Sequence, residues 1–422
     1  MNRYDSYEDS GVKWLGEIPS HWEVLAIKHI LKLKKEIVGK RSSQYDLLSL
    51  TLKGVVKRDM ENPEGKFPAS FDTYQLVEPN DFVFCNFDNE ETPRAVGLSP
   101  YKGMITGAYD VLSRKNANMS DKYLIYYFLY IDDAKRFKPL YKGLRKTVPF
   151  DSFMSYKIPV PSIREQDAIV AYLDAVTSKI DTAITQQQKM IDLLNERKQI
   201  IINNAVTKGL DPNVKMKPSG VDWIGDIPEH WEIKRGKYLF CIINELSTTG
   251  KEELLTVSDK TGITPRSAKN VNMFMSESLI GHKKCHVGDI CSNIMWMWHG
   301  AVGVTKYDGV ISPSYAVYRQ QDEYFIDEYL DLLLRLPKLV KLYTSLSTGL
   351  TESRLRLYPT DFLNIFFFLP PVDEQIIIID YLEKVCHPID KDIESAKKLI
   401  SLLQERKQII INDVVTGKVK VV

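Results

Sequence analysis

Long hydrophobic runs, paired cysteines and nucleotide-binding loops are all missing from this chain of 422 residues. No apolar run approaches the ~18 residues that cross a membrane, and the polar N-terminus lacks the apolar stretch of a signal peptide, so we expect a cytoplasmic protein. No Gly-x-x-x-x-Gly-Lys-Ser/Thr loop is present to hold nucleotide phosphates. The cysteines are odd in number and scattered, which favours reduced thiols: Cys85, Cys241, Cys285, Cys291 and Cys386.

An excess of one charge sign and a metal-binding motif are also missing. The 56 Lys and Arg nearly balance the 55 Asp and Glu, which excludes a uniformly basic nucleic-acid coat but is compatible with local patches. His282, Cys285, His286 and Cys291 form a loose cluster, but their spacing fits no standard zinc site. We therefore expect no metal in this chain.

What the chain does contain is a repeat with a period of 209 residues. Residues 10–24, Ser-Gly-Val-Lys-Trp-Leu-Gly-Glu-Ile-Pro-Ser-His-Trp-Glu-Val, return at 219–233 with 10 of 15 positions identical. Residues 193–203, Leu-Leu-Asn-Glu-Arg-Lys-Gln-Ile-Ile-Ile-Asn, return at 402–412 with 10 of 11 identical. Because both echoes keep one register, the chain is a duplicated frame that holds two divergent inserts.

Two long helices are predicted within this frame. No Gly or Pro occurs from Glu165 to Val206, and Gly209 and Gly417 are placed as C-terminal caps of the two copies. Apolar residues recur at steps of four and three, which is typical of a heptad seam. The seam positions are Ile169, Leu173, Val176, Ile180, Ala183, Met190, Leu194 and Ile201, then Ile378, Leu382, Val385, Ile389, Ala396, Leu399, Leu403 and Ile410.

Each helix is the natural partner of the other, and an antiparallel pair would bring the chain termini together. Pro388 has no counterpart at Lys179, so the second helix should kink or restart near His387. An antiparallel pair of similar helices has a pseudo-two-fold axis, which would present the two inserts in inverted orientation. That geometry fits duplex DNA, and because the inserts differ in sequence we expect a two-part, non-palindromic target.

Faint correspondences inside the inserts indicate shared strands and turns. Leu47–Thr51 resembles Leu254–Ser258, and Asp81-Phe-Val-Phe resembles Asp289-Ile-Cys-Ser. Val96-Gly97 likewise resembles Val302-Gly303. Short β-rich runs between Gly and Asp turns predict mixed α/β modules, each with a curved sheet.

The tryptophans divide into two classes. Four lie in the repeated box, where anchoring of the module to the helices is favoured over base stacking, because a base-reading residue should differ between copies. Met295-Trp-Met-Trp-His299 occurs in one insert only. It is either a buried strand or, since alternation puts Trp296 and Trp298 on one face, a contact with DNA that also includes His299.

Basic residues beside glycine or small polar residues are the other candidate contacts, because phosphates attract Lys and Arg and base edges accept bidentate Arg. Each one taken singly is better explained by a solvated surface, and the hypothesis rests on the clusters. The strongest clusters, 143–147 and 349–356, each precede the last strand before a frame helix. The candidates are Lys40, Arg41, Lys53, Lys57, Arg58, Arg94, Lys142, Arg145 and Lys146, then Lys260, Arg266, Lys269, Arg354 and Arg356.

These residues together resemble the specificity subunit of type I restriction-modification systems. The resemblance rests on the paired Ile-Pro-x-His-Trp-Glu boxes, the Pro-x-x-x-Glu-Gln helix openings at 161–166 and 370–375, and the two Glu-Arg-Lys-Gln-Ile-Ile-Ile-Asn copies. It covers the whole chain. It implies target-recognition domains at 1–160 and 211–369, conserved helical regions at 161–210 and 370–422, and recognition of a bipartite, asymmetric DNA site.

The resemblance also implies partners: two methylation subunits, which bind S-adenosylmethionine and methylate adenine, and restriction subunits that use ATP and Mg²⁺. This chain itself is then expected to be non-catalytic and without a cofactor. Its residues agree, because the only Pro-Pro, Pro370-Pro371, is followed by Val372 and no Asn/Asp-Pro-Pro-aromatic motif for a flipped base exists. The alternatives are a helical scaffold whose inserts bind proteins, and a nuclease with unrecognised acidic residues.

Overall fold

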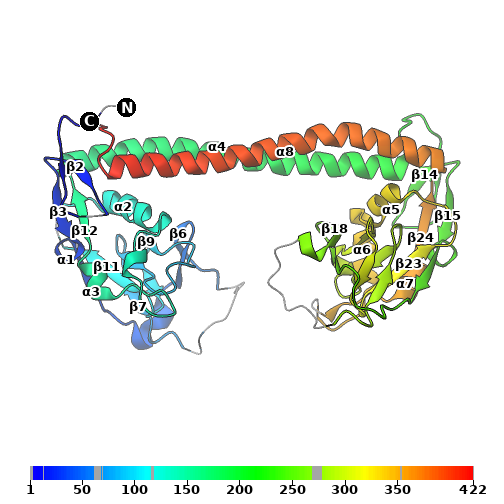
Figure 1. Ribbon diagram of the computed structural model, residues 1–422, viewed down its shortest axis with the longest axis horizontal. Helices are drawn as coiled ribbons and strands as arrows, with labels where there is room; N and C mark the ends of the chain where they lie inside the picture. Colours follow the sequence, from blue (N-terminus) through cyan, green and yellow to red (C-terminus); the bar gives the residue numbers. More distant parts are fainter. Residues whose placement is uncertain are drawn as a thin grey trace. The chain divides into compact units, whose positions relative to one another are not determined.

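The computed structural model describes residues 3–12, 14–60, 68, 70–115, 118–268, 278–351 and 354–421. The chain folds into two compact units, unit 1 (Met1–Gln188 with Lys397–Val422) and unit 2 (Lys189–Ala396). Each unit combines antiparallel strands with helices (Figure 1). The predicted fold class, mixed α/β with two modules joined by long helices, is confirmed.

Unit 1 is built around a four-stranded antiparallel sheet in the order β4-β11-β8-β9. Smaller antiparallel pairs, β5 with β6 and β10 with β7, extend the module. The elements before the long helix are β1 (Tyr7–Asp9), β2 (Glu17–Pro19), β3 (Glu23–Ala26), α1 (Ile27–Ile30), β4 (Leu31–Lys34), η1 (Gly39–Gln44), β5 (Leu48–Thr51), β6 (Gly54–Lys57), β7 (Gln75–Val77), β8 (Phe82–Phe84), β9 (Val96–Leu98), β10 (Gly103–Ile105), β11 (Asp110–Arg114), α2 (Asp121–Asp133), η2 (Lys138–Leu140), α3 (Phe150–Met154) and β12 (Lys157–Val160).

Unit 2 repeats this plan with the sheet order β16-β23-β20-β21. Pairs β17 with β18 and β19 with β22 take the places of the smaller pairs of unit 1. Its elements are β13 (Met216–Pro218), β14 (Asp226–Pro228), β15 (Glu232–Arg235), η3 (Gly236–Tyr238), β16 (Phe240–Ile243), β17 (Leu255–Ser258), β18 (Gly262–Pro265), η4 (Arg266–Ala268), β19 (Lys283–Cys285), β20 (Ile290–Ser292), η5 (Met297–His299), β21 (Val302–Val304), β22 (Gly309–Ile311), β23 (Ala316–Gln320), α5 (Asp327–Leu334), α6 (Pro337–Leu346), α7 (Pro359–Asn364) and β24 (Phe366–Leu369).

Each insert opens and closes on a pair of neighbouring strands. In unit 1, β3 pairs with β12 from Glu23↔Val160 to Ala26↔Lys157. In unit 2, β15 pairs with β24 from Glu232↔Leu369 to Arg235↔Phe366. The shared sheet orders and these closing pairs confirm the correspondences predicted between the two inserts. The chain therefore enters and leaves each module on adjacent, paired strands next to the frame.

The frame helices are α4 (Ile163–Lys208) and α8 (Val372–Val415), and portions of both belong to each unit. In unit 1 the Lys407 Nζ lies 2.7 Å from Asp181 Oδ1, and in unit 2 the Lys198 Nζ lies 2.6 Å from Asp390 Oδ1. These two ion pairs are related by the 209-residue period. Within each unit the two helix portions run antiparallel, as predicted (Figure 1).

The chain termini also meet in unit 1, as the antiparallel prediction requires. The Tyr7 hydroxyl donates a hydrogen bond of 3.0 Å to the carbonyl of Gly417. Gly209 and Gly417 both have positive φ, 74° and 75°, which confirms their prediction as C-terminal caps. A Cβ atom at Gly417 would lie 3.1 Å from the Trp22 ring, so this cap also brings the helix end against the repeated box.

Two details of the helices differ from the prediction. Met190 and Leu399 are exposed, and Ile191 and Ile393 are buried instead. An α-helix with 3.6 residues per turn drifts by about 20° per heptad against a 3.5-residue repeat, so a fixed heptad assignment loses the buried face.

A kink or a restart of the second helix was predicted near His387, and the restart is wrong, because α8 continues through Pro388. A proline inside a helix costs about 3 kcal/mol through its missing N–H and its ring clash. Here Pro388 is on the exposed side, while the adjoining Cys386 and Ile389 are buried. Packing of that inner face is the physical reason the helix continues.

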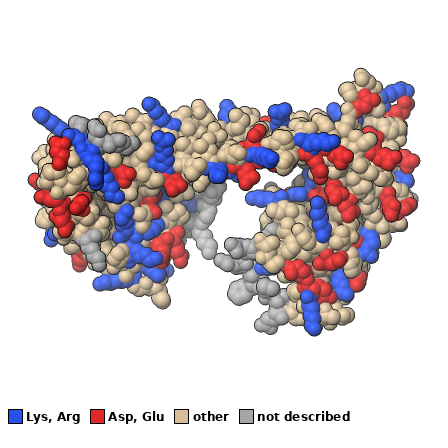
Figure 2. Space-filling model, turned by 45° about the horizontal axis from the view of Figure 1, so that its top comes forward, with Lys and Arg blue, Asp and Glu red and all other residues tan. Residues whose placement is uncertain are grey.

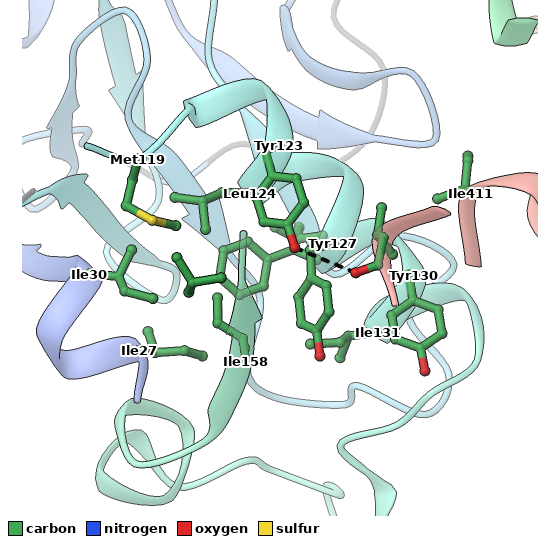
Figure 3. Packing of buried hydrophobic residues seen from close by; sticks show 14 of the residues in the cluster. Ile27, Ile30, Met119, Tyr123, Leu124, Tyr127, Tyr130, Ile131, Ile158 and Ile411 are labelled. Atoms are coloured by element: carbon green, nitrogen blue, oxygen red, sulfur yellow. Dashed lines mark hydrogen bonds between the residues drawn. The ribbon is translucent and has the colours of Figure 1, made fainter. Parts of the chain in front are cut away.

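A buried tyrosine links each module to its frame helices. In unit 1 the Tyr123 hydroxyl of α2 lies 3.0 Å from the Pro159 carbonyl and 3.4 Å from the Val415 carbonyl at the end of α8 (Figure 3). In unit 2 the Tyr329 hydroxyl of α5 donates to the Val206 carbonyl near the end of α4 at 2.7 Å. The bonds to Val415 and Val206 satisfy carbonyls in the last turn of a frame helix, which have no partner within the helix.

Candidate nucleic-acid interface

The repeated Trp box anchors each module to the first turn of a frame helix. Trp22 is 3% exposed, and its Nε1 donates to Glu165 at 3.3 Å, while the ring of His21 contacts the same carboxylate at 2.9 Å. In unit 2 Trp231 and His230 make the same contacts to Glu374, at 2.9 and 2.8 Å. The glutamate stands in the first turn of a frame helix in both copies. The predicted anchoring role is confirmed.

The carboxylate in this anchor has a perturbed acidity. Burial by itself raises the pKa of Glu165, but hydrogen bonds from His21, Trp22 and Ser162 outweigh burial and hold the pKa below its ordinary value. A negative charge in the first turn also interacts favourably with the helix dipole. The structure therefore stabilises the ionised form of Glu165.

This lowered pKa predicts acid sensitivity of unit 1. The stabilisation is complete above the ordinary glutamate pKa and is lost as the pH falls through the lowered folded-state value. Between about pH 5 and pH 3, the melting temperature of the wild type should fall more steeply than that of Glu165→Gln. Thermal unfolding followed by circular dichroism across this range is the measurement. Parallel curves for the two proteins would contradict the assignment.

Eight of the nine basic candidates of unit 1 occupy three surface positions. Lys40 and Arg41 are exposed on η1, and Lys53 is exposed in the turn between β5 and β6. Lys57 at the end of β6 forms an ion pair of 2.6 Å with Asp46, and Arg58 follows it half-buried. Because the β5–β6 hairpin carries Lys53, Lys57 and Arg58, the structure brings these three predicted contacts onto one element.

The third position is the loop from Lys142 to Thr147. Lys142, Arg145 and Lys146 are exposed on it, and Lys146 lies 3.3 Å from Glu90. Arg94 is elsewhere and is 17% exposed. Its Nη1 contacts Asp133 at 2.9 Å and Asp132 at 3.5 Å. The side chain of Arg94 thus holds β9 to α2, which is a structural role that the sequence pattern did not reveal.

In unit 2 the structure joins two of the predicted groups. His299 Nδ1 lies 3.0 Å from Asp259 Oδ2, beside Lys260 in the turn between β17 and β18. Arg335 donates to the carbonyl of Asp259 at 2.7 Å and so fixes the same turn. Asp259 and Arg335 were not predicted from the sequence. Only their contacts with the turn that carries Lys260 identify them as supports of this candidate surface. Arg266 lies in η4, Arg354 and Arg356 are exposed, and Lys269 is outside the described residues.

The Trp296 segment is not the strand considered from its alternating pattern. It is a turn followed by η5, and the Trp298 Nε1 donates to the Met295 carbonyl at 2.9 Å. Trp296 and Trp298 still share one side, with stacked rings at 5.8 Å and an interplanar angle of 18°. Trp296 is 53% exposed, so its ring offers a flat apolar face to a base or sugar.

The charge distribution is mixed rather than uniformly basic. Figure 2 shows Lys and Arg interspersed with Asp and Glu over the visible face of each unit.

Among the described residues, no group of three or more His, Cys, Asp or Glu side chains is placed to hold a metal ion. None of the helices described by the structure is long and apolar enough to cross a membrane.

Comparison with known proteins finds similar proteins both by sequence and by fold. Residues 96–191 match the family model of the type I restriction modification DNA specificity domain. The chain is 26% identical to the type I restriction enzyme MjaVIII specificity subunit of Methanocaldococcus jannaschii, over 96% of this chain and 94% of that protein. A specificity subunit of the same organism described for the MjaX system is also 26% identical, over 96% of both chains.

The fold has a match among solved structures. A chain from the structure described as "Structural basis underlying complex assembly and conformational transition of the type I R-M system" superposes with a TM-score of 0.66 at 14% identity. The match covers 95% of this chain and 99% of that one. The resemblance recognised from the repeated motifs is therefore confirmed: the chain is similar to type I restriction-modification specificity subunits along nearly its whole length, and residues 96–191 match the model of their DNA specificity domain.

Proposed function

We propose that this chain is the non-catalytic subunit that recognises a bipartite, asymmetric DNA site and docks methylation subunits through its helices. The observation that carries the proposal is one scaffold built twice with different surfaces. The two modules share sheet order and closing strands, yet the exposed groups differ, with Arg145 and Lys146 in unit 1 and Trp296 and His299 in unit 2. Two similar modules with different contact residues should read two different half-sites.

The test uses the chain assembled with its methylation subunits. The complex is incubated with random DNA duplexes, and bound duplexes are recovered and sequenced. We expect enrichment of two unlike half-sites separated by a spacer of constant length. Enrichment of no split motif would contradict DNA recognition and would favour a scaffold whose modules bind proteins. The isolated chain with Mg²⁺ should not cleave DNA, and cleavage would contradict the non-catalytic assignment.

Docking of the methylation subunits is supported by repeated apolar exposure on the frame helices. Leu193 and Ile200 on α4 are 52% and 53% exposed, and their copies Leu402 and Ile409 on α8 are 52% and 51% exposed. Exposed apolar residues that repeat with the frame fit a surface that binds the same partner twice. S-adenosylmethionine, ATP and Mg²⁺ would then be bound by the partner subunits, including the restriction subunits.

Charge placed on one copy of this surface should release one methylation subunit. We expect Leu193→Asp with Ile200→Asp to weaken binding of one subunit at least about 30-fold, since buried interface anchors contribute about 2 kcal/mol or more. Native mass spectrometry should show the complex with one methylation subunit in place of two. Asn195→Asp, exposed on the same helix, is the matched control and should keep both. Retention of both subunits by the double variant would locate docking elsewhere.

A further inference from the structure

The two most exposed large apolar side chains of the described residues are leucines at equivalent places in the two modules. Leu144 is 101% exposed and Leu350 is 94% exposed. Each follows a glycine, Gly143 or Gly349, in the loop before the last strand of its module. A single exposed leucine is ordinary on a protein surface, but the same Gly-Leu pair in two otherwise divergent loops is not explained by chance exposure.

The equivalence of the two loops rests on their hydrogen bonds. Lys142 and Thr147 exchange backbone bonds of 2.8 and 3.0 Å across the first loop, and Thr348 and Arg356 exchange two bonds of 3.0 Å across the second. The residue after each bridge is buried and bonded to a corresponding segment. Val148 N–H donates to the Asn86 carbonyl at 2.8 Å, and Leu357 N–H donates to the Ile294 carbonyl at 3.0 Å.

The first loop is held firmly despite its exposed tip. The Asp88 N–H donates to the Arg145 carbonyl at 2.7 Å, and the Lys146 Nζ lies 3.3 Å from Glu90. Gly143, with φ of 69°, turns the chain so that Leu144 lies at the tip. Val148 at the root packs in the core of unit 1, so the loop projects one apolar group from a rigid base.

The charges beside each leucine favour DNA as the molecule that covers it. Lys142, Arg145 and Lys146 are exposed beside Leu144, and Arg354 and Arg356 are exposed near Leu350. Cations bind backbone phosphates, and an apolar side chain among them can enter between base steps, as in proteins that wedge apart stacked bases. A protein partner that bound these loops would need two sites, each with acidic groups around an apolar pocket.

We propose that Leu144 and Leu350 are wedge residues, each of which inserts its side chain between neighbouring base pairs of one half-site. The inference rests on the proposed recognition of DNA, and it adds a second way in which the chain would distinguish DNA sequences. Opening a stacked step costs least at flexible pyrimidine–purine steps, so the wedge contributes specificity through DNA deformability as well as through base contacts. Each half-site should then contain one flexible step opposite its leucine.

The test uses the assembled complex and the duplex recovered by the selection described above. 2-Aminopurine, which fluoresces when unstacked, is placed at successive positions of each half-site. Leu144→Ala should abolish one wedge-dependent signal in one half-site only, and Leu350→Ala should do so in the other. Each variant should bind DNA about tenfold more weakly, and the double variant about a hundredfold, because the wedges act on separate half-sites.

The controls separate the wedge from folding and from DNA recognition. Val287→Ala, at another exposed apolar loop residue, should bind like the wild type, and Leu144→Met should keep the fluorescence signal. If the wild-type complex binds DNA but the alanine variants match its affinity and fluorescence, the wedge is wrong while DNA recognition stands. Loss of methylation subunits from these variants would show that the leucines contact protein, and would also overturn the wedge. If the wild type selects no motif, the proposed function itself fails.

Discussion

Replacement of Trp231 by alanine is expected to destabilise unit 2 by about 3–5 kcal/mol, the usual cost of removing a fully buried tryptophan. The Trp231 side chain is 0% exposed, and its ring stacks on Phe368 with centroids 5.5 Å apart. Its Nε1 donates to Glu374 at 2.9 Å. The variant would leave both a cavity and a carboxylate that has lost a hydrogen-bond donor.

Urea unfolding followed by circular dichroism measures this effect, with the two units treated as separate transitions where they unfold separately. Trp14→Ala is the matched control from the same repeated box. Trp14 is 43% exposed and stacks on Tyr156 at 4.7 Å, so its loss should cost about 1 kcal/mol. A Trp231→Ala protein that unfolds at the wild-type urea concentration would show that the anchor does not stabilise the module.

The second large effect concerns DNA specificity. Exchange of residues 236–365 for the equivalent insert of a related protein should change one half of the recognised site and leave the other half unchanged. The exchange points lie at the ends of β15 and β24, which pair over four residues. Because the insert leaves and rejoins the frame on neighbouring strands, its replacement should leave the frame helices and unit 1 folded.

Sequencing of methylated positions in a strain that expresses the exchanged system reads both halves at once. The reciprocal exchange of residues 27–156, between β3 and β12, is the matched control and should change only the other half. A discrimination of about 10³-fold or more between old and new half-sites is expected, as for specific over non-specific DNA binding. A change in both halves from one exchange would contradict the modular assignment.

The frame was predictable because its signals are local in the chain. A helix without Gly or Pro, a capping glycine and a heptad pattern each act within a few residues, and the duplication supplied a second copy of the capping glycine and of the heptad pattern. The failures have local explanations too. Heptad counting placed Met190 and Leu399 on the buried face, although both are exposed. The alternating pattern in Met295–His299 suggested a strand, but the segment forms a tight turn that ends at Gly300, where φ is 95°.

The sequence by itself therefore determined the duplication, the long helices, the resemblance to type I restriction-modification specificity subunits and the anchoring role of the Trp box. Only the tertiary structure decided which cations have carboxylate partners, as Arg94 has with Asp132 and Asp133, and which apolar residues lie at an exposed loop tip, as Leu144 does. The physical reason is that exposure and ion pairing depend on segments distant along the chain. Asp132 is in α2 and Glu90 is in a loop, and no periodicity in the sequence places either beside its partner.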